Sequence, residues 1–96
     1  MRFEFESEIW RWGARSEDWF FVSVPEELSA GIREIPRMPR GFGSVRVRVR
    51  IGGTEWRTSI FPAKDGTYAL PLKKAVRDAE GLDYPGTCRI VLDVLD

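Results

Sequence analysis

The sequence predicts a mainly β protein: a small closed or double-split antiparallel β-barrel of about six strands with two short capping helices. Most segments alternate apolar and polar residues with the period of a strand, and two segments show helical spacing. So many strands in 96 residues must curl to remove their exposed edges. We expect one domain over residues 1–96, since a chain of this length has room for one core.

The first expected strand alternates an apolar face with an acidic one. The apolar face begins with Phe3 and Phe5, and the acidic face carries a ladder of glutamates, Glu4, Glu6 and Glu8 (the Glu ladder). Trp10 falls on the acidic side, so we expect a bulge or a twist near Ile9–Trp10. We expect a turn over residues 13–18, and the nearly continuous apolar run 19–24 predicts a strand that is buried on both faces.

Pro25 is expected to begin the first helix, because the missing N–H costs nothing there and Glu26 and Glu27 favour the positive end of the helix dipole. The apolar residues Leu28, Ile32 and Ile35 share one face, and Pro36 ends the helix. A loop follows over residues 37–43.

The clearest element is a hairpin around Gly52–Gly53, where two alternating runs flank a turn that accepts positive φ. The predicted inward pairs are Val45 with Ile60, Val47 with Thr58, Val49 with Trp56 and Ile51 with Thr54. The predicted outward pairs are Arg46 with Ser59, Arg48 with Arg57 and Arg50 with Glu55. Pro62 ends the second strand.

The remaining elements are a short strand over residues 67–70, a second helix and a last strand. Pro71 is expected to begin the helix, and Gly81 to close it as a left-handed cap with Leu82 folding back. A turn over residues 84–86 leads into the strand 87–95. There Cys88 alternates with Ile90, so its side chain points inward and we expect it to be inert.

Composition excludes several kinds of chemistry. The chain has no histidine and one cysteine, which excludes histidine-based triads, histidine-ligated metals, an intrachain disulfide and a zinc-binding cysteine cluster. We expect no cofactor. Equal numbers of basic and acidic residues, 15 each, argue against a polybasic protein. The lone cysteine and the absence of a signal-peptide pattern or a long apolar run predict a cytoplasmic protein without a membrane partner.

Several segments carry a family resemblance over nearly the whole chain. They are Val24–Ser29, Gly41–Val47, Ile51–Pro62, Gly66–Tyr68, Leu70–Arg77 and Gly81–Leu82. Their ordered succession resembles the domain of unknown function 1905 family of bacterial proteins. The resemblance implies a small β-barrel, which some members fuse to a bacteriocin-protection (YdeI/OmpD-associated) domain.

A weaker, local likeness covers residues 70–86 and the alternating strand after them. Leu70–Pro71, Arg77, Gly81–Leu82 and Pro85–Gly86 are similar to the swapped-hairpin half of transition-state-regulator DNA-binding proteins, whose barrels are double-split. The likeness departs at Thr87, where that family usually has an acidic residue. It informs topology and not DNA binding.

Four groups of residues are candidate sites. Arg46, Arg48, Arg50 and Arg57 form a basic face that suits phosphates; we expect instead that the Glu ladder lies on a neighbouring strand and pairs with it. If the two ladders are apart, the basic face is free and nucleic-acid binding gains support. The second candidate is the loop with Arg37, Arg40 and Phe42, which is either a ligand clamp or a packed connection. The third is the helix with Lys73, Lys74 and Arg77, which presents either an anion site or a solvated face.

The fourth group is aromatic: Trp10, Trp12, Trp19 and Trp56 either line a pocket inside the barrel or fill its core, and we expect core. The leading functional hypothesis is a non-catalytic bacterial module that binds an unknown small molecule or protein, as a monomer or weak homodimer. One alternative is a nucleic-acid-binding barrel that uses the Arg46/Arg48/Arg50/Arg57 face, a less favoured partner class. The second is a small enzyme without histidine or metal; no catalytic residue is singled out.

Overall fold

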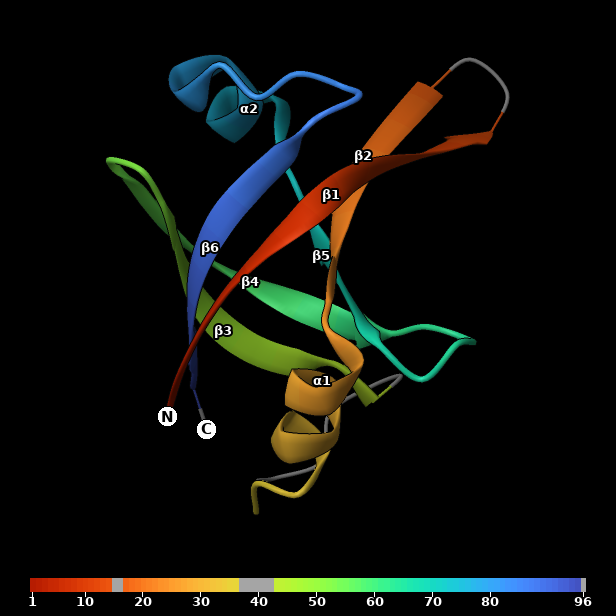
Figure 1. Ribbon diagram of the computed structural model, residues 1–96, viewed down its shortest axis with the longest axis vertical. Helices are drawn as coiled ribbons and strands as arrows, with labels where there is room; N and C mark the ends of the chain where they lie inside the picture. Colours follow the sequence, from red (N-terminus) through yellow and green to blue (C-terminus); the bar gives the residue numbers. More distant parts are fainter. Residues whose placement is uncertain (15–16, 37–42, 96) are drawn as a thin grey trace.

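The computed structural model describes residues 1–14, 17–36 and 43–95, which fold into a closed barrel of six antiparallel strands with two short helices (Figure 1). The predicted fold class is confirmed. The strands follow one another around the barrel in the order β1-β2-β5-β4-β3-β6. The elements are β1 (Arg2–Ala14), β2 (Glu17–Val24), α1 (Glu26–Arg33), β3 (Val45–Ile51), β4 (Thr54–Pro62), β5 (Tyr68–Pro71), α2 (Lys74–Glu80) and β6 (Thr87–Val94).

The core lies inside the barrel and follows the period-two pattern of the strands. In β3 the alternate residues Val45, Val47, Val49 and Ile51 are buried, and in β6 the buried residues are Cys88, Ile90 and Leu92. Each fully buried aliphatic side chain contributes roughly 1.5–3 kcal/mol to folding. The inward orientation that was predicted for Cys88 is confirmed.

The β3–β4 hairpin has the predicted register at all seven pairs. Gly52 takes a φ of +58° in the turn, a conformation that glycine adopts without steric cost. The outward-facing residues of this hairpin are therefore those that the sequence indicated.

Of the two features expected near Ile9–Trp10, a bulge or a twist, the bulge was wrong. Strand β1 keeps one unbroken register with β6 up to Glu8 and another with β2 from Ile9 onward, so it changes partner without an inserted residue. Trp10 does lie on the side of the Glu ladder, where its ring stacks on Phe21 at 4.7 Å between centroids and its Nε1–H donates to the Ser23 hydroxyl.

The expectation that residues 19–24 are buried on both faces was also wrong. Val22 and Val24 are fully buried, whereas the alternate residue Trp19 is 50% exposed. Beyond Ile9 the first strand pairs only with β2, so the far part of this β1–β2 ribbon extends past the barrel wall (Figure 1). A two-stranded ribbon has no second layer to bury its outer face.

The two helices lie at opposite ends of the barrel (Figure 1). Helix α1 follows Pro25 as predicted. Helix α2 begins at Lys74, three residues later than expected, because Pro71 is the last residue of β5. Gly81 closes α2 with a φ of +60°, and the N–H of Leu82 donates to the carbonyl oxygen of Arg77 at 2.9 Å. The predicted left-handed cap is therefore confirmed. Neither described helix has the length and apolarity to cross a membrane.

Candidate functional site

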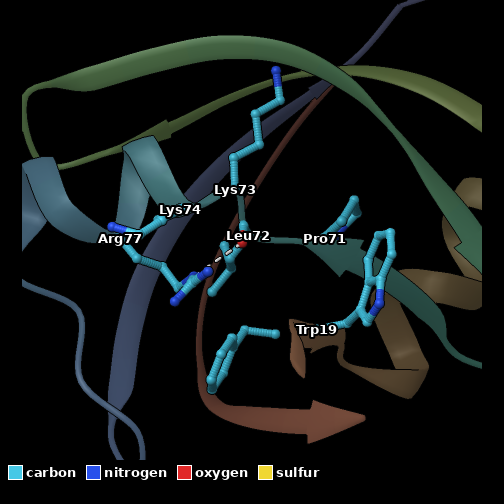
Figure 2. Close-up of a pocket in the computed structure, with 7 residues that line it drawn as sticks. Trp19, Pro71, Leu72, Lys73, Lys74 and Arg77 are labelled. Carbon is cyan, nitrogen blue, oxygen red and sulfur yellow. Dashed lines mark hydrogen bonds between the residues drawn. The ribbon is translucent and has the colours of Figure 1, made fainter. Parts of the chain in front are cut away.

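A pocket of about 380 Å³ lies at the α2 end of the barrel (Figure 2). It is bounded by the start of β2, the end of β5 and the first turn of α2. Its lining residues are Trp19, Phe20, Pro71, Leu72, Lys73, Lys74 and Arg77. All three cations that the sequence singled out on this helix, Lys73, Lys74 and Arg77, therefore line a concave surface together with aromatic side chains.

Backbone pairing fixes the walls of this pocket. At the end of β5 the N–H of Leu72 donates to the carbonyl oxygen of Phe20 at 2.9 Å, which extends the β2–β5 pairing by one step. Leu72 is buried and anchors this corner to the core. The chain then turns through Lys73, whose backbone is extended, and enters α2.

Arg77 lies flat against the aromatic wall. The carbon atom at the centre of its guanidinium lies 4.3 Å from the centroid of the Phe20 ring, and its Nε–H donates to the carbonyl oxygen of Leu72 at 3.2 Å. The Phe20 ring in turn meets the edge of Tyr84 at 5.7 Å between centroids. Within the described part of the chain, the two terminal nitrogens of Arg77 have no hydrogen-bond partner. Their donors are free for a ligand anion.

The two lysines of the pocket differ in their availability. Lys74 donates to the carboxylate of Asp78 at 2.8 Å, and this hydrogen bond together with the lysine charge lowers the pKa of Asp78. Lys73 makes no hydrogen bond or ion pair to any described residue, and it is exposed. Lys73 is therefore a second unpaired cation at the edge of this pocket, and Figure 2 shows its side chain extended away from Arg77.

Trp19 forms the side of the pocket opposite Arg77. Figure 2 shows its indole beside Pro71, with Arg77 across the hollow. Its register partner, Trp12, is 55% exposed and does not line the pocket. The expectation that the tryptophans fill the core was wrong for three of the four: Trp12 and Trp19 are exposed, and Trp10 is half-buried on the outer face. Trp56 packs against the core as expected, half-buried. Because side chains alternate along a strand and Val22 points inward, Trp19, three residues earlier, should have been expected on the outer face.

The Phe20–Arg77 stack separates this pocket from a second hollow of about 210 Å³. The second hollow is lined by Ile9, Phe20, Arg77, Leu82, Asp83 and Tyr84. Larger hollows of about 580 Å³ beside Trp10 and about 690 Å³ beside the start of α1 have glutamates and no cation in their linings. The two hollows on either side of Arg77 are therefore the ones that combine aromatic side chains with a cation.

The basic face lies elsewhere, on the outer wall of the barrel. The structure brings together Arg46, Arg48, Arg50 and Arg57 on the outward side of β3 and β4. The expected neighbour relation with the Glu ladder was wrong, because β6 lies between β1 and β3. Glu4 contacts Arg89 of β6 at 3.5 Å instead. The spacing of charges along the strands does not determine which strands are neighbours; that order is set by how the barrel closes.

The remaining candidate residues give little support for a functional site. Arg37, Arg40 and Phe42 lie outside the described residues. Burial raises the pKa of the Cys88 thiol, with a smaller contribution from the charge of Glu6. No group of three or more His, Cys, Asp or Glu side chains within residues 1–14, 17–36 and 43–95 is arranged to hold a metal ion.

Comparison with known proteins identifies the family. The family model described as Domain of unknown function (DUF1905) matches residues 5–92, which is nearly the whole chain. The chain belongs to this family. No curated protein matches it. For this DUF1905 domain, the match covers all six strands in whole or in large part and every residue that lines the pocket.

Proposed function

We propose that this DUF1905 protein is a non-catalytic binding module that takes a small anionic ligand with an aromatic or apolar portion into the pocket between β2, β5 and α2. The observation that carries the proposal is the arrangement of Arg77, whose guanidinium is held against Phe20 while its terminal nitrogens lack a partner in the described chain.

The two sides of the pocket suit the two parts of such a ligand. A ring can stack against the exposed indole of Trp19 and contact Pro71, while a carboxylate or phosphate meets Arg77 and is attracted by the charge of Lys73 at the edge of the pocket. Ligand pockets are typically concave, mostly apolar and equipped with a few polar groups that fix orientation. The volume of about 380 Å³ is near the lower end of that class, roughly 300–1,000 Å³, and suits a ligand of one or two rings.

The side chains that line the pocket support binding rather than catalysis. They include no carboxylate, cysteine or histidine, the groups that most often act as general bases or nucleophiles. The resemblance to a bacterial family and the single buried cysteine, Cys88, support a bacterial cytoplasmic protein.

Isothermal titration calorimetry with three related probes tests the proposal. Phenyl phosphate carries both a ring and an anion, phenol lacks the anion and inorganic phosphate lacks the ring. We expect saturable binding of phenyl phosphate and at least about tenfold weaker binding of the other two, because a hydrogen bond to a charged group contributes roughly 1.5–3 kcal/mol. Equal affinity for phenyl phosphate and inorganic phosphate would contradict a site that recognises the ring.

Two pairs of variants test whether phenyl phosphate binds in this pocket. Trp19→Ala should abolish measurable binding of phenyl phosphate and Trp12→Ala should leave it intact, although both indoles are exposed to a similar degree. Lys73→Gln should weaken binding severalfold, whereas Lys64→Gln removes the same charge from an exposed lysine outside the pocket. If the two members of each pair behaved alike, the proposed site would be wrong.

A further inference from the structure

We propose that the outer wall formed by β3 and β4 binds single-stranded nucleic acid. This site is separate from the pocket at α2. Its members are the outward residues Arg46, Arg48, Arg50, Arg57 and Phe61, called here the Arg–Phe face.

The hairpin register brings the cations of this face together. Arg48 lies directly opposite Arg57, and the two like charges are unfavourable as neighbours across strands. Alternate residues along a strand point to the same side and lie about 6.8 Å apart, so the three arginines of β3 form a row. A sheet specified only for stability would place opposite charges in such positions, as it does at Arg50 and Glu55.

The carboxylates nearest to the row on β6 and β1 are engaged elsewhere. Asp93 of β6 lies opposite Arg48 and interacts with its charge, but both oxygens of Asp93 accept hydrogen bonds from Arg2, at 3.1 and 3.3 Å. Beyond β6, Glu4 of the Glu ladder contacts Arg89. Among the described residues, the guanidinium groups of Arg46, Arg50 and Arg57 have no hydrogen-bond or ion-pair partner, and all three are exposed.

Arg48 carries a donor on this face that no described residue satisfies. Its side chain is half-buried, and its Nε is buried without a hydrogen-bond partner in the described part of the chain. An unsatisfied buried donor on a charged group is costly. A phosphate that sits between Arg48 and Arg57 would neutralise the like-charge pair.

The exposed ring of Phe61 favours a nucleic acid over other polyanions as the ligand of this face. It is 41% exposed and lies on the outward side of β4, two positions beyond Ser59, which is the partner of Arg46. Single-stranded nucleic acids bind to surfaces that combine a basic track for phosphates with an aromatic side chain on which a base stacks. The overall charge of zero is compatible with this because the Glu ladder lies on the far side of β6.

Fluorescence anisotropy with labelled oligodeoxythymidylate and oligouridylate at 50 mM salt tests the proposal. We expect binding of at least one probe, and a logarithmic salt slope of about −2 if three phosphates are contacted, since each contact on a single strand contributes roughly −0.7. Arg57→Gln should weaken binding and reduce the slope by about 0.7. Arg89→Gln removes the same charge from the next strand and should leave both unchanged.

Phe61→Ala should lower the affinity at least about fivefold without changing the salt slope, because it removes stacking and no charge. No binding of either probe at 50 mM salt would overturn the proposal. Equally strong binding of polyglutamate, or oligonucleotide binding that Phe61→Ala leaves unaltered, would show a site for acidic protein surfaces instead. Association of the chain with itself, abolished by Arg57→Gln, would point to the Glu ladder of a second copy and would also overturn it.

Discussion

At the scale of single residues, one serine ties three elements together. Ser29 of α1 is completely buried; its hydroxyl donates to the carbonyl oxygen of Val24 at 2.9 Å and accepts from the backbone N–H of Tyr68 at 3.1 Å. It therefore joins α1 to the ends of β2 and β5. The sequence placed Ser29 in the first helix, but its role depends on β5 arriving beside it, which no local pattern indicates.

Ser29→Ala should lower the free energy of unfolding by about 1–3 kcal/mol, because the substitution removes two buried hydrogen bonds. Urea denaturation measures the difference. Ser59→Ala is the control, since Ser59 is half-buried and its hydroxyl makes no hydrogen bond to a described residue. An equal effect of the two substitutions would contradict the bridging role of Ser29.

At the scale of elements, the β3–β4 hairpin holds α2 in place. The hydroxyl of Thr54 donates to the carboxylate of Glu80, at the end of α2. A Cβ added at Gly52 would lie 2.0 Å from a Glu80 oxygen, so the absence of a side chain there permits the contact. The turn that sets the hairpin register thus also positions the helix that carries Arg77.

Gly52→Ala should destabilise the protein by about 1–2 kcal/mol, because its φ is +58° and the new methyl group displaces Glu80. The matched substitution Gly53→Ala, which meets no atom within 4 Å, should cost clearly less. Thermal unfolding followed by circular dichroism compares the two. A smaller loss for Gly52→Ala than for Gly53→Ala would be incompatible with the Glu80 contact.

The hairpin and the aromatic segments show how much of the fold the sequence could predict. Gly52–Gly53 and strict alternation determine a register locally, so all seven pairs were predicted. The positions of Trp10 and Trp19 depend on where β1 leaves β6 and pairs with β2 alone. That change of partner is a property of the closed barrel, and the apolar run 19–24 was therefore misinterpreted. The same limit hid Trp19 from the candidate site, although Lys73 and Arg77 were identified.

At the scale of the whole molecule, the barrel closes where the two terminal strands meet. Strands β1 and β6 pair side by side over residues 2–8 and 87–93 (Figure 1), and the N–H of Val94 donates to the carbonyl oxygen of Met1 at 3.1 Å. Arg2 spans this seam to Asp93; the hydrogen bond from Arg2, together with its charge, lowers the pKa of Asp93. A carboxyl group with a lowered pKa in the folded state contributes stability above its unfolded pKa, and the contribution is lost as the pH falls through the folded value.

The melting temperature should therefore fall on acidification below about pH 5. It should change little between about pH 5 and pH 8, because the chain has no histidine to titrate there. Asp93→Asn should reduce the acid-induced loss, whereas Asp83→Asn, an exposed aspartate without a hydrogen bond to a described residue, should not. Melting curves across this pH range provide the measurement, and a steeper acid loss in Asp93→Asn would contradict the sign.

The central claim is that the pocket beside Trp19 and Arg77 binds a ligand with a ring and an anion. The most direct test follows the four tryptophan indole N–H signals by heteronuclear NMR during titration with phenyl phosphate. The claim predicts a saturable shift of the Trp19 signal that is clearly larger than the shift of Trp12, which lies opposite Trp19 but does not line the pocket. A stationary Trp19 signal, or equal shifts of the two exposed tryptophans, would contradict it.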